Sequence, residues 1–464
     1  MQNKDAIIEQ LRRQVASLLE RVRQLEQENQ MLKEKIATLE RNSTNSSKPP
    51  SSDIVKPIKP ARDSAEKLKP GGQPGHRKFQ RQPFTQEQID KVIEYELDEK
   101  DAVGLTVLDE WLVIQQIELP EKMYYVTEHR ARKYLDPVTG KIHIAPMPPG
   151  IRKGGLLGSG FSTMIAFMKA GCHASYSTIR QFCKEIYGLE ISRGMLNKTI
   201  QKVSDALEAP YQWLFNRLPD CGYLGVDETG HKNAGWLHWS WCFQDADFSV
   251  FHISPSRGSG VLKKVLGETF EGTLGCDYYS AYRKYMKDCE VSVQFCMAHL
   301  IREIRFIAEQ MHEKLSRWGG SLLEYLKKLF DVLHNKDKYS AEGFKQILKQ
   351  IKDGFLRKVR RPPDHRLARN LAKRFCGKAA ENYFRFLTEP EVEPTNNSTE
   401  REIRHLVIDR HVTQGTCSDA GMRWCERAWT IIATCKKQGR NVFDFIHKAV
   451  IAHWTKNQYP SFIC

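Results

Sequence analysis

The chain has 464 residues, long enough for roughly two to four domains, and its 71 Lys and Arg against 56 Asp and Glu give a formal net charge of +15. This charge favours a polyanionic partner such as nucleic acid, although a ribosome or a membrane surface would suit it equally. The N-terminal region is polar, which argues against a signal peptide, and no apolar stretch of about 18 residues is present that could span a membrane. The 12 cysteines include no Cys-x-x-Cys pair, which argues against a disulfide framework. We therefore expect a cytoplasmic protein with reduced thiols.

Residues 1–40 carry the heptad repeat of a leucine zipper. Leucine occupies the d positions and the a positions are mostly β-branched, a pattern that favours two parallel helices. One a position is Asn29, which costs stability but fixes the register and the number of helices. We therefore expect a homodimeric coiled coil, while antiparallel packing within a larger assembly stays open. The repeat consists of Leu11, Leu18, Leu25, Leu32 and Leu39 at d, and of Ile8, Val15, Val22, Asn29 and Ile36 at a.

Residues 41–94 form a predicted linker that is rich in Ser, Pro, Gly and Lys. Between positions 41 and 81, ten basic residues face three acidic ones, so the segment cannot bury a core. It is either a plain tether or a basic arm that follows a DNA groove. Residues 95–150 then predict a small β-rich module. Because this module contains no cysteine, we expect no structural zinc in it.

Residues 151–218 predict a helical region that contains a helix-turn-helix-like pair. The two helices are expected over residues 176–188 and 191–200, with Gly188 at the turn and Ser192 as the cap of the second helix. Arg193, Asn197 and Lys198 would then be available for contacts in a DNA groove. Helical pairs are also common scaffolding, and the sequence favours neither reading over the other.

Residues 219–300 predict an α/β core built on a mixed sheet. Short apolar runs end at Asp227 and at Asp277, and further strands are expected on either side of a polar turn and after the second acid. The order is strand, hairpin, helix, strand, helix, strand, which is the order of an RNase H-like sheet flanked by helices. The further strands are predicted at residues 234–243, 248–253 and 291–296, and the helices at residues 259–266 and 281–286.

Three carboxylates are the candidate catalytic residues. Asp227 and Asp277 each close an apolar strand, 50 residues apart (277 minus 227), and Glu400 opens a predicted helix. Together at one sheet edge they would hold two divalent ions roughly 3.5–4 Å apart across a scissile phosphate, the arrangement of a metal nuclease. Taken one at a time, each acid also fits a structural role: a strand end for Asp227, a helix cap for Asp277 and a capping box for Glu400.

Residues 301–395 predict a helical insertion between the second and third acids, and residues 396–464 supply C-terminal helices that cover the sheet. A basic run at residues 357–366 suits DNA that flanks the cut, or a solvated loop. After Glu400, Arg401 and Arg404 lie on one side of the predicted helix. They are candidates for phosphate binding, with pairing to nearby acids as the alternative.

Several motifs in this order resemble a DDE transposase of the insertion sequence 66 family over nearly the whole chain. The combination is specific, whereas any one motif alone would be weak. The motifs are Asn45-Ser-Ser-Lys-Pro-Pro-Ser-Ser-Asp53, Gly71-Gly-Gln-Pro-Gly-His76, Asp227-Glu-Thr229, Asp277-Tyr-Tyr-Ser-Ala-Tyr282, Cys296-Met-Ala-His299 and Asn396-Asn-Ser-Thr-Glu-Arg401.

The resemblance implies a bacterial enzyme that cuts the ends of its own element and joins the freed 3′-hydroxyl to target DNA. It implies Asp227, Asp277 and Glu400 as ligands of two Mg²⁺ ions, with Mn²⁺ as a substitute. The expected DNA partners are terminal inverted repeats and target DNA, with a dimer pairing the two ends and accessory proteins encoded by the element as possible helpers. The family often has a cysteine zinc ribbon where residues 95–150 have none.

The segment from Cys296 to His299 resembles a Cys-x-x-His element that follows the second acid in several transposase groups. Two ligands are too few for a zinc site, so we expect structural packing, with a DNA contact by His299 as the sharper alternative. Two other functions stay open for the whole chain. One is a dimeric sequence-specific DNA-binding protein with a non-catalytic RNase H-like scaffold, and the other is a metal-dependent nuclease without strand transfer.

Overall fold

The computed structural model describes residues 2–39, 82–98, 100–101, 104–105, 108–109, 111–151 and 155–462. They divide into two compact units, Met1–Pro57 with Pro146–Cys464, and Ile58–Ala145. Most of the predicted linker lies outside the described residues, and with it the motifs at residues 45–53 and 71–76.

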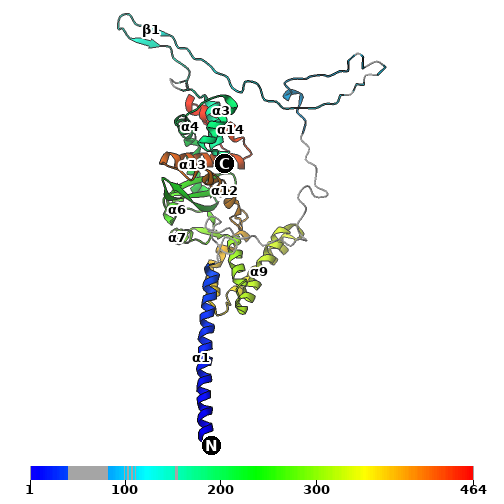
Figure 1. Cartoon of the computed structure of the whole chain (residues 1–464), viewed down its shortest axis with the longest axis vertical. Coiled ribbons are helices and arrows are strands. Elements are labelled where there is room, and N and C mark those ends of the chain that lie inside the picture. The colour runs from blue at the N-terminus through cyan, green and yellow to red at the C-terminus, as the bar shows by residue number, and fades with distance from the viewer. Residues whose placement is uncertain are drawn as a thin grey trace. The chain divides into compact units, whose positions relative to one another are not determined.

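The N-terminal segment forms one uninterrupted helix, α1 (Gln2–Leu39), drawn in blue in Figure 1. Its zipper leucines Leu11, Leu18, Leu25 and Leu32 are 54–64% exposed in the single chain, and Asn29 is exposed as well. The helix itself is therefore confirmed, while the coiled coil stays a prediction. Neither α1 nor any other helix of the described residues is long and apolar enough to cross a bilayer.

The second unit contains a small antiparallel hairpin made of β1 (Lys133–Leu135) and β2 (Ile142–Ile144). Asp136 shapes its turn, because its carboxylate accepts a hydrogen bond from the Val138 amide at 2.9 Å. A single 3-10 turn, η3 (Gln86–Gln88), precedes the hairpin. Among the described residues of the 95–150 range, β1 and β2 are the only strands.

The larger unit, Met1–Pro57 with Pro146–Cys464, is called the main unit. In chain order, four of its helices come between α1 and the sheet: α2 (Ser159–Ala170), α3 (Tyr176–Tyr187), α4 (Arg193–Ala206) and α5 (Glu208–Arg217). The predicted helix pair is confirmed as α3 and α4. Gly188 ends α3 in the left-handed conformation at φ 63°, which glycine adopts without steric cost. Ser192 caps α4, since its hydroxyl accepts a hydrogen bond from the Met195 amide at 3.2 Å.

A five-stranded mixed sheet forms the centre of the main unit, in the order β5-β4-β3-β6-β7. β3 to β5 form an antiparallel meander, whereas β6 and β7 run parallel to β3. Each predicted strand is present, and the two predicted helices appear as α6 and α7. The bounds are β3 (Tyr223–Asn233), β4 (Trp236–Gln244), β5 (Ser249–Ser254), α6 (Ser259–Leu266), β6 (Thr273–Cys276), α7 (Ser280–Cys289) and β7 (Ser292–Phe295).

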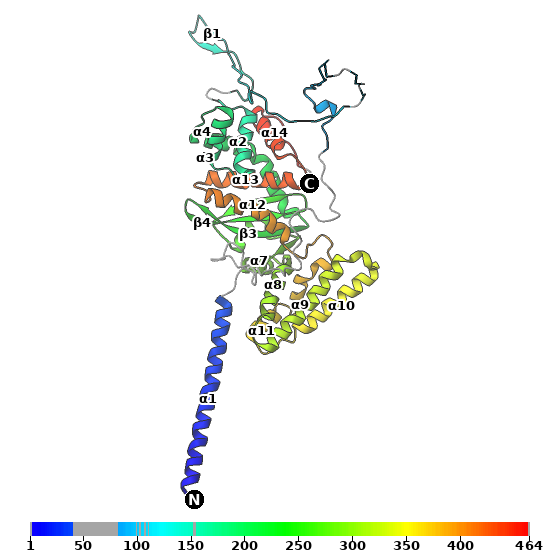
Figure 2. The same ribbon diagram turned by 45° about the vertical axis from the view of Figure 1, so that its right-hand side comes forward.

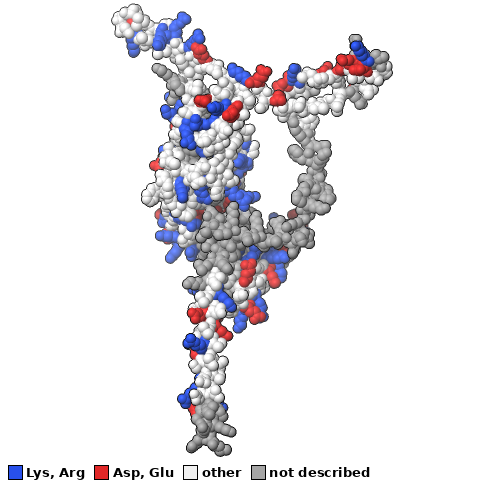
Figure 3. Space-filling view, viewed as in Figure 1, with Lys and Arg blue, Asp and Glu red and all other residues white. Residues whose placement is uncertain are grey.

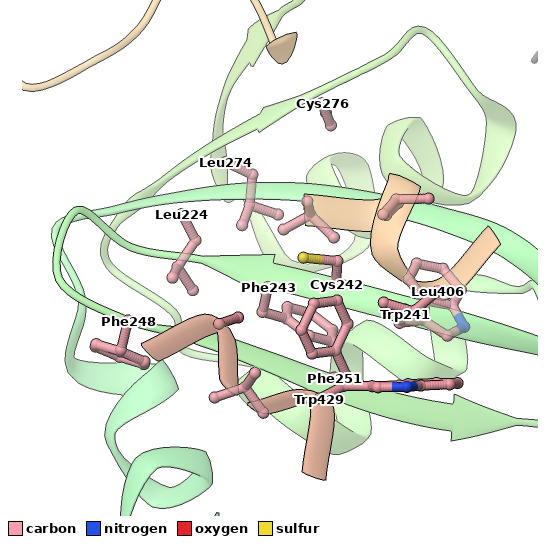
Figure 4. Packing of buried hydrophobic residues seen from close by; sticks show 14 of the residues in the cluster. Leu224, Trp241, Cys242, Phe243, Phe248, Phe251, Leu274, Cys276, Leu406 and Trp429 are labelled. Atoms are coloured by element: carbon pink, nitrogen blue, oxygen red, sulfur yellow. The ribbon is translucent and has the colours of Figure 1, made fainter. Parts of the chain in front are cut away.

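Three helices end the chain: α12 (Asn397–Thr413), α13 (Asp419–Lys437) and α14 (Val442–Thr455). Only α12 and α13 pack on the strands, and Figure 4 shows Leu406 and Trp429 beside Trp241 and Phe251. The prediction that all the C-terminal helices cover the sheet is wrong for α14, which packs against α2, α4 and α13. α13 also shields the edge strand, because Thr430 accepts a hydrogen bond from the Phe251 amide at 3.0 Å. Amides that would otherwise attract another strand are thus satisfied within the chain.

The predicted insertion between the second and third acids is helical. Beyond β7 the chain forms α8 (Met297–Ala308), α9 (Glu313–His334), α10 (Ala341–Val359) and α11 (Arg366–Lys373). α9 packs against α8 and α10, and Figure 2 shows α9 to α11 as one helical lobe. The lobe is joined to α8 by paired hydrogen bonds from Arg374 to Glu303, both at 2.7 Å.

Candidate active site

The parallel pairing of β3 with β6 brings Asp227 and Asp277 to neighbouring positions. Tyr223 pairs with Thr273 and Gly225 with Gly275. This register has an offset of 50, which equals the spacing of the two aspartates in the sequence. β6 ends at Cys276, so Asp277 is the first residue beyond its strand, as predicted.

The prediction that Asp227 closes its strand is wrong. β3 continues six residues further to Asn233, because its antiparallel partner β4 extends past the end of β6 and pairs with β3 up to Asn233 and Trp236. Asp227 therefore lies in the middle of a strand, at the point where the parallel neighbour stops. Both aspartates remain partly exposed there.

Helix α12 brings the third acid to this point. Asn396, which precedes the helix, donates a hydrogen bond from Nδ2 to the carbonyl oxygen of Val226 at 3.0 Å. One turn later the Thr399 hydroxyl donates to Gln244 of β4 at 2.9 Å, in a buried position. Thr399 packs directly on Gly225, where a β-carbon would collide with its hydroxyl. The start of α12 is thus fixed on β3 and β4, which brings Glu400 close enough for its charge to act on Asp227 and Asp277.

Glu400 lies beside two side chains of α8. Its Oε1 atom lies 3.6 Å from the Arg302 guanidinium and 3.8 Å from His299 Nε2. The helix-capping roles that Asp277 and Glu400 could have filled are not seen. The residue that caps α12 is Asn396, without a side-chain hydrogen bond, and the residue that caps α7 is Tyr279. The Asp277 carboxylate accepts a hydrogen bond from the Tyr279 amide at 2.9 Å.

The carboxylates affect one another electrostatically. Burial raises the pKa of Asp227 well above its ordinary value, and the charges of Glu228, Asp277 and Glu400 raise it further. Burial also raises the pKa of Asp277; the Tyr279 amide and the Arg257 charge oppose that rise, and Glu400 adds to it. For His299, burial lowers the pKa to about 4, with Arg302 adding to the effect. The site therefore concentrates negative charge in surroundings that disfavour it.

A fourth carboxylate, Glu228, is not predicted from the sequence, because alternation along a strand turns it away from Asp227. It is buried, and it accepts hydrogen bonds from Arg257 Nε at 2.8 Å and from the Tyr282 hydroxyl. Arg257 in turn stacks on Trp239 and Tyr279, with its guanidinium carbon 4.5 and 4.0 Å from the ring centres. Burial and the Asp277 charge raise the pKa of Glu228 to about 7.

The donor chemistry at this site fits a divalent cation. Carboxylate oxygens are the ligands that Mg²⁺ and Mn²⁺ prefer, and a cation would relieve the mutual repulsion that raises the pKa of Asp227. The acidic side chains do not converge on one point, since no three His, Cys, Asp or Glu side chains of the described residues are placed to hold a metal ion. Glu400 instead faces Arg302 and His299.

The predicted DNA-contacting residues lie in two places. Arg193, Asn197 and Lys198 are exposed on α4, and Arg401 and Arg404 are exposed on α12. His299 is different, because its side chain is only 15% exposed and lies beside Glu400. Figure 3 shows Lys and Arg side chains spread over the face of the main unit on which Figure 1 labels α4 and α13.

Comparison with known proteins identifies the family. The family model described as Transposase IS66 family matches residues 154–424, a range that includes the whole sheet and all three acids. This chain belongs to that family. The match confirms, over these residues, the resemblance seen in the sequence. A second model, described as a family of unknown function (DUF6444), matches residues 2–82 of the IS66-family chain.

One curated relative of this IS66-family chain comes from Sinorhizobium fredii (strain NBRC 101917 / NGR234) and is named Uncharacterized protein y4qI. It is 22% identical over 294 residues, which are 57% of this chain and 53% of the relative. The chain thus spans about half the length of the curated relative that it matches.

Proposed function

We propose that the chain cuts DNA at the terminal inverted repeats of its own element and joins the freed ends to target DNA. Asp227, Asp277 and Glu400 are the catalytic carboxylates of this proposal, in an RNase H-like core. The observation that carries it is the β3–β6 register, whose offset of 50 puts the two aspartates side by side. The strand order and the hydrogen bond from Asn396 to Val226 support the same arrangement.

The chemistry consists of two phosphoryl transfers. In the first, a water oxygen bonds to phosphorus while the bond to the 3′ oxygen breaks, which frees a 3′-hydroxyl. In the second, that 3′ oxygen bonds to a target phosphorus and displaces a target 3′ oxygen. Two divalent ions held by Asp227, Asp277 and Glu400 would supply charge neutralisation and activation of the attacking oxygen. No covalent bond to the protein forms.

The side chains of the protein have separate tasks in this proposal. Asn396 and Thr399 hold α12 on the sheet and so keep Glu400 near the aspartates. Arg302 and His299 orient Glu400, and His299 is also close enough to contact DNA at the site. Arg401 and Arg404 bind phosphates next to the cut, whereas Arg193, Asn197 and Lys198 on α4 contact the groove of the end sequence.

The partner of α1 in this proposal is a second copy of the chain. Its exposed stripe of leucine and β-branched residues is what a parallel two-stranded coiled coil would bury. A homodimer would pair the two ends of the element. Asn29→Val tests this part, because unique dimerisation should be lost; an unchanged dimer would show that Asn29 does not set the assembly.

The test of the function is a Mg²⁺ or Mn²⁺ reaction with labelled DNA from both flanks of this gene, with and without accessory proteins of the element. Wild type is compared with Asp227→Asn, Asp277→Asn and Glu400→Gln. Asp247→Asn serves as the matched control, because Asp247 is exposed in the β4–β5 turn of the same sheet. Metal-dependent joining by wild type and the control, lost in the three variants with folding and binding retained, is the expected result.

Two other results would each replace the proposal. Cutting without joining, even from a pre-cut end, would make the chain a metal-dependent nuclease. Binding without any cutting, with accessory proteins present, would make it a dimeric DNA-binding protein with a non-catalytic scaffold.

A further inference from the structure

The outer face of α12 is a basic and apolar track that starts at Glu400. Arg401, Arg404, Ile408, His411 and Val412 are all exposed along it. The two later acids of the helix turn inward. Glu402 lies 3.9 Å from Lys437 of α13, and Asp409 is buried 3.7 Å from His173. Beyond Glu400 the exposed face of α12 therefore carries no carboxylate.

The tip of the β3–β4 hairpin extends this track with one large apolar side chain. Trp236 is 77% exposed and pairs with Asn233, which lies on the same face of β3 as Gly225, the face that α12 covers. Leu237 is 59% exposed and lies on the opposite face. The turn between the strands uses Ala234 at φ 50° and Gly235 at φ 84°, which gives the tight hairpin geometry with two positive φ angles. Residues 229–238 contain one lysine, two histidines and no acid.

The tip is fixed to the segment that follows α12 by backbone hydrogen bonds. The Thr416 amide donates to the Lys232 carbonyl oxygen and the Ala234 amide donates to the Thr416 carbonyl oxygen, both at 2.8 Å. Thr416 also accepts or donates a side-chain hydrogen bond with His231 at 3.0 Å. The exposed tryptophan is therefore presented by a pinned hairpin, so that displacing it would break these bonds.

Two independent elements set the distance from the acids to this tip. Along α12, the twelve residues from Glu400 to Val412 rise about 18 Å. Along β3, the six residues from Asp227 to Asn233 rise about 20 Å. Figure 2 shows α12 lying over β3 and β4, and α12 packs against both strands. A span of about 20 Å corresponds to roughly six base pairs of duplex DNA at 3.4 Å each.

We propose that this surface binds the DNA that enters the active site, and that Trp236 stacks on or wedges into a base step about six base pairs from the cut. Arg401 and Arg404 face the phosphates between the two points. The charge of the surface selects DNA as the occupant. Along α12 beyond Glu400 and along residues 229–238, the exposed tryptophan has cationic neighbours and no exposed acid, and the first exposed acid after α12 is Asp419. Such a setting suits the nucleic-acid wedge, in which an apolar side chain opens a base step that phosphate contacts have positioned. This inference rests on the proposed function in taking DNA as the substrate and the three acids as the place where it is cut.

The experiment measures binding of the full chain to fluorescent duplexes from the flanks of this gene, in EDTA so that no cutting occurs. 2-Aminopurine is placed at each position from three to nine base pairs from the end of the terminal inverted repeat in these flanks. Wild type should raise the 2-aminopurine signal at about six base pairs. Trp236→Ala should abolish that signal and weaken binding by about 5- to 150-fold, the range found when a stacking aromatic is removed, whereas Trp236→Phe should retain most of both.

Trp213→Ala is the matched control, because Trp213 is a 42% exposed tryptophan on α5; its binding should stay within about twofold of wild type. Equal binding and equal 2-aminopurine signals for wild type and Trp236→Ala would overturn the proposal. A change in sedimentation of the free Trp236→Ala chain, with DNA binding unchanged, would also overturn it and assign the surface to contact between copies. The readout needs no cleavage. An inactive wild type would therefore reject the proposed function, while the binding and 2-aminopurine measurements would still test whether Trp236 contacts DNA.

Discussion

The Asn396 side chain donates a hydrogen bond to the carbonyl oxygen of Val226 at 3.0 Å, so the residue that precedes the helix of Glu400 is joined to the residue that precedes Asp227. The two residues are far apart in the chain, and both are buried. The bond therefore fixes the start of the helix that carries Glu400 to the strand position next to Asp227.

We expect Asn396→Ala to lower the free energy of unfolding by about 1–3 kcal/mol, because it removes a buried hydrogen bond and leaves the Val226 carbonyl without this donor. DNA cutting should fall more than DNA binding, since Glu400 loses its fixed position. Asn397→Ala is the control, because Asn397 is exposed on the first turn of the same helix. Urea denaturation and the cutting assay would show both effects, and equal behaviour of the two variants would rule out the link.

A second prediction concerns the close approach of α12 to β3. Gly225→Ala should destabilise the main unit by about 1–3 kcal/mol, because the added β-carbon would collide with the Thr399 hydroxyl. The helix must then move away from the strand, and cutting should be lost with it. Gly260→Ala in α6 is the matched control, since a β-carbon there meets nothing within 4 Å. A Gly225→Ala protein as stable and as active as that control would contradict the packing described.

The sequence allowed most of the sheet to be predicted, because each strand is a short apolar run between turn residues. The helix at residues 259–266 and the helix pair at residues 176–200 followed from similarly local signals. The exact course of β3 did not, since its length depends on how far β4 extends beyond β6. A single strand contains no information about where its neighbour ends.

The site was predictable only in part for a related reason. Asp227, Asp277 and Glu400 each stand at a recognisable local position, whereas Arg257 and Arg302 have no sequence pattern that links them to the acids. Their roles come from long-range packing, with Arg302 on α8 and Arg257 in the loop before α6. Glu228 was left out on strand alternation, which gives the face of a residue but not what lies on that face.

The stability of the main unit should depend on the protonation of His405. Burial lowers the pKa of His405 from 6.5 to about 3, and the charges of His173 and Lys436 add to the effect. Between pH 6.5 and 3 the unfolded chain therefore binds a proton at His405, whereas the folded chain does not. Neutral His405 does not lower the free energy of unfolding above pH 6.5, but as the pH falls from 6.5 towards 3 that free energy decreases by at most about 1.4 kcal/mol per pH unit.

Comparison of His405→Gln with wild type isolates this effect, because the substituted side chain does not titrate in this range. The free energy of unfolding of wild type minus that of the variant should decrease as the pH is lowered from 8 to 5. The raised pKa of Asp409 acts in the opposite direction but is common to both proteins. His411→Gln is the control, since His411 is exposed on the same helix; a parallel change in that variant would point to a general acid effect.

The last prediction concerns the pairing of Arg257 with Glu228. The Glu228 side chain is 1% exposed and its Arg257 partner 29%, so removing the arginine leaves a buried carboxylate. Arg257→Ala should cost about 3 kcal/mol, near the low end for an uncompensated buried charge, because Tyr282 still donates to Glu228. Lys263→Ala, which removes a surface pair with the 72% exposed Glu268, should cost far less than Arg257→Ala, because solvent screens that pair.

The double variant with Arg257→Ala and Glu228→Gln separates a charge effect from lost packing. If the cost of Arg257→Ala comes from the unpaired carboxylate, neutralising Glu228 should recover at least about 1 kcal/mol relative to the sum of the single variants. Additive losses would instead assign the effect to the stacking of Arg257 on Trp239 and Tyr279.

A charge effect would also reach the site, because Arg257 opposes the rise in the pKa of Asp277. Without that arginine, Asp277 would hold its proton to higher pH, so the acidic limb of the cutting reaction should move to higher pH in Arg257→Ala and stay in place in Lys263→Ala.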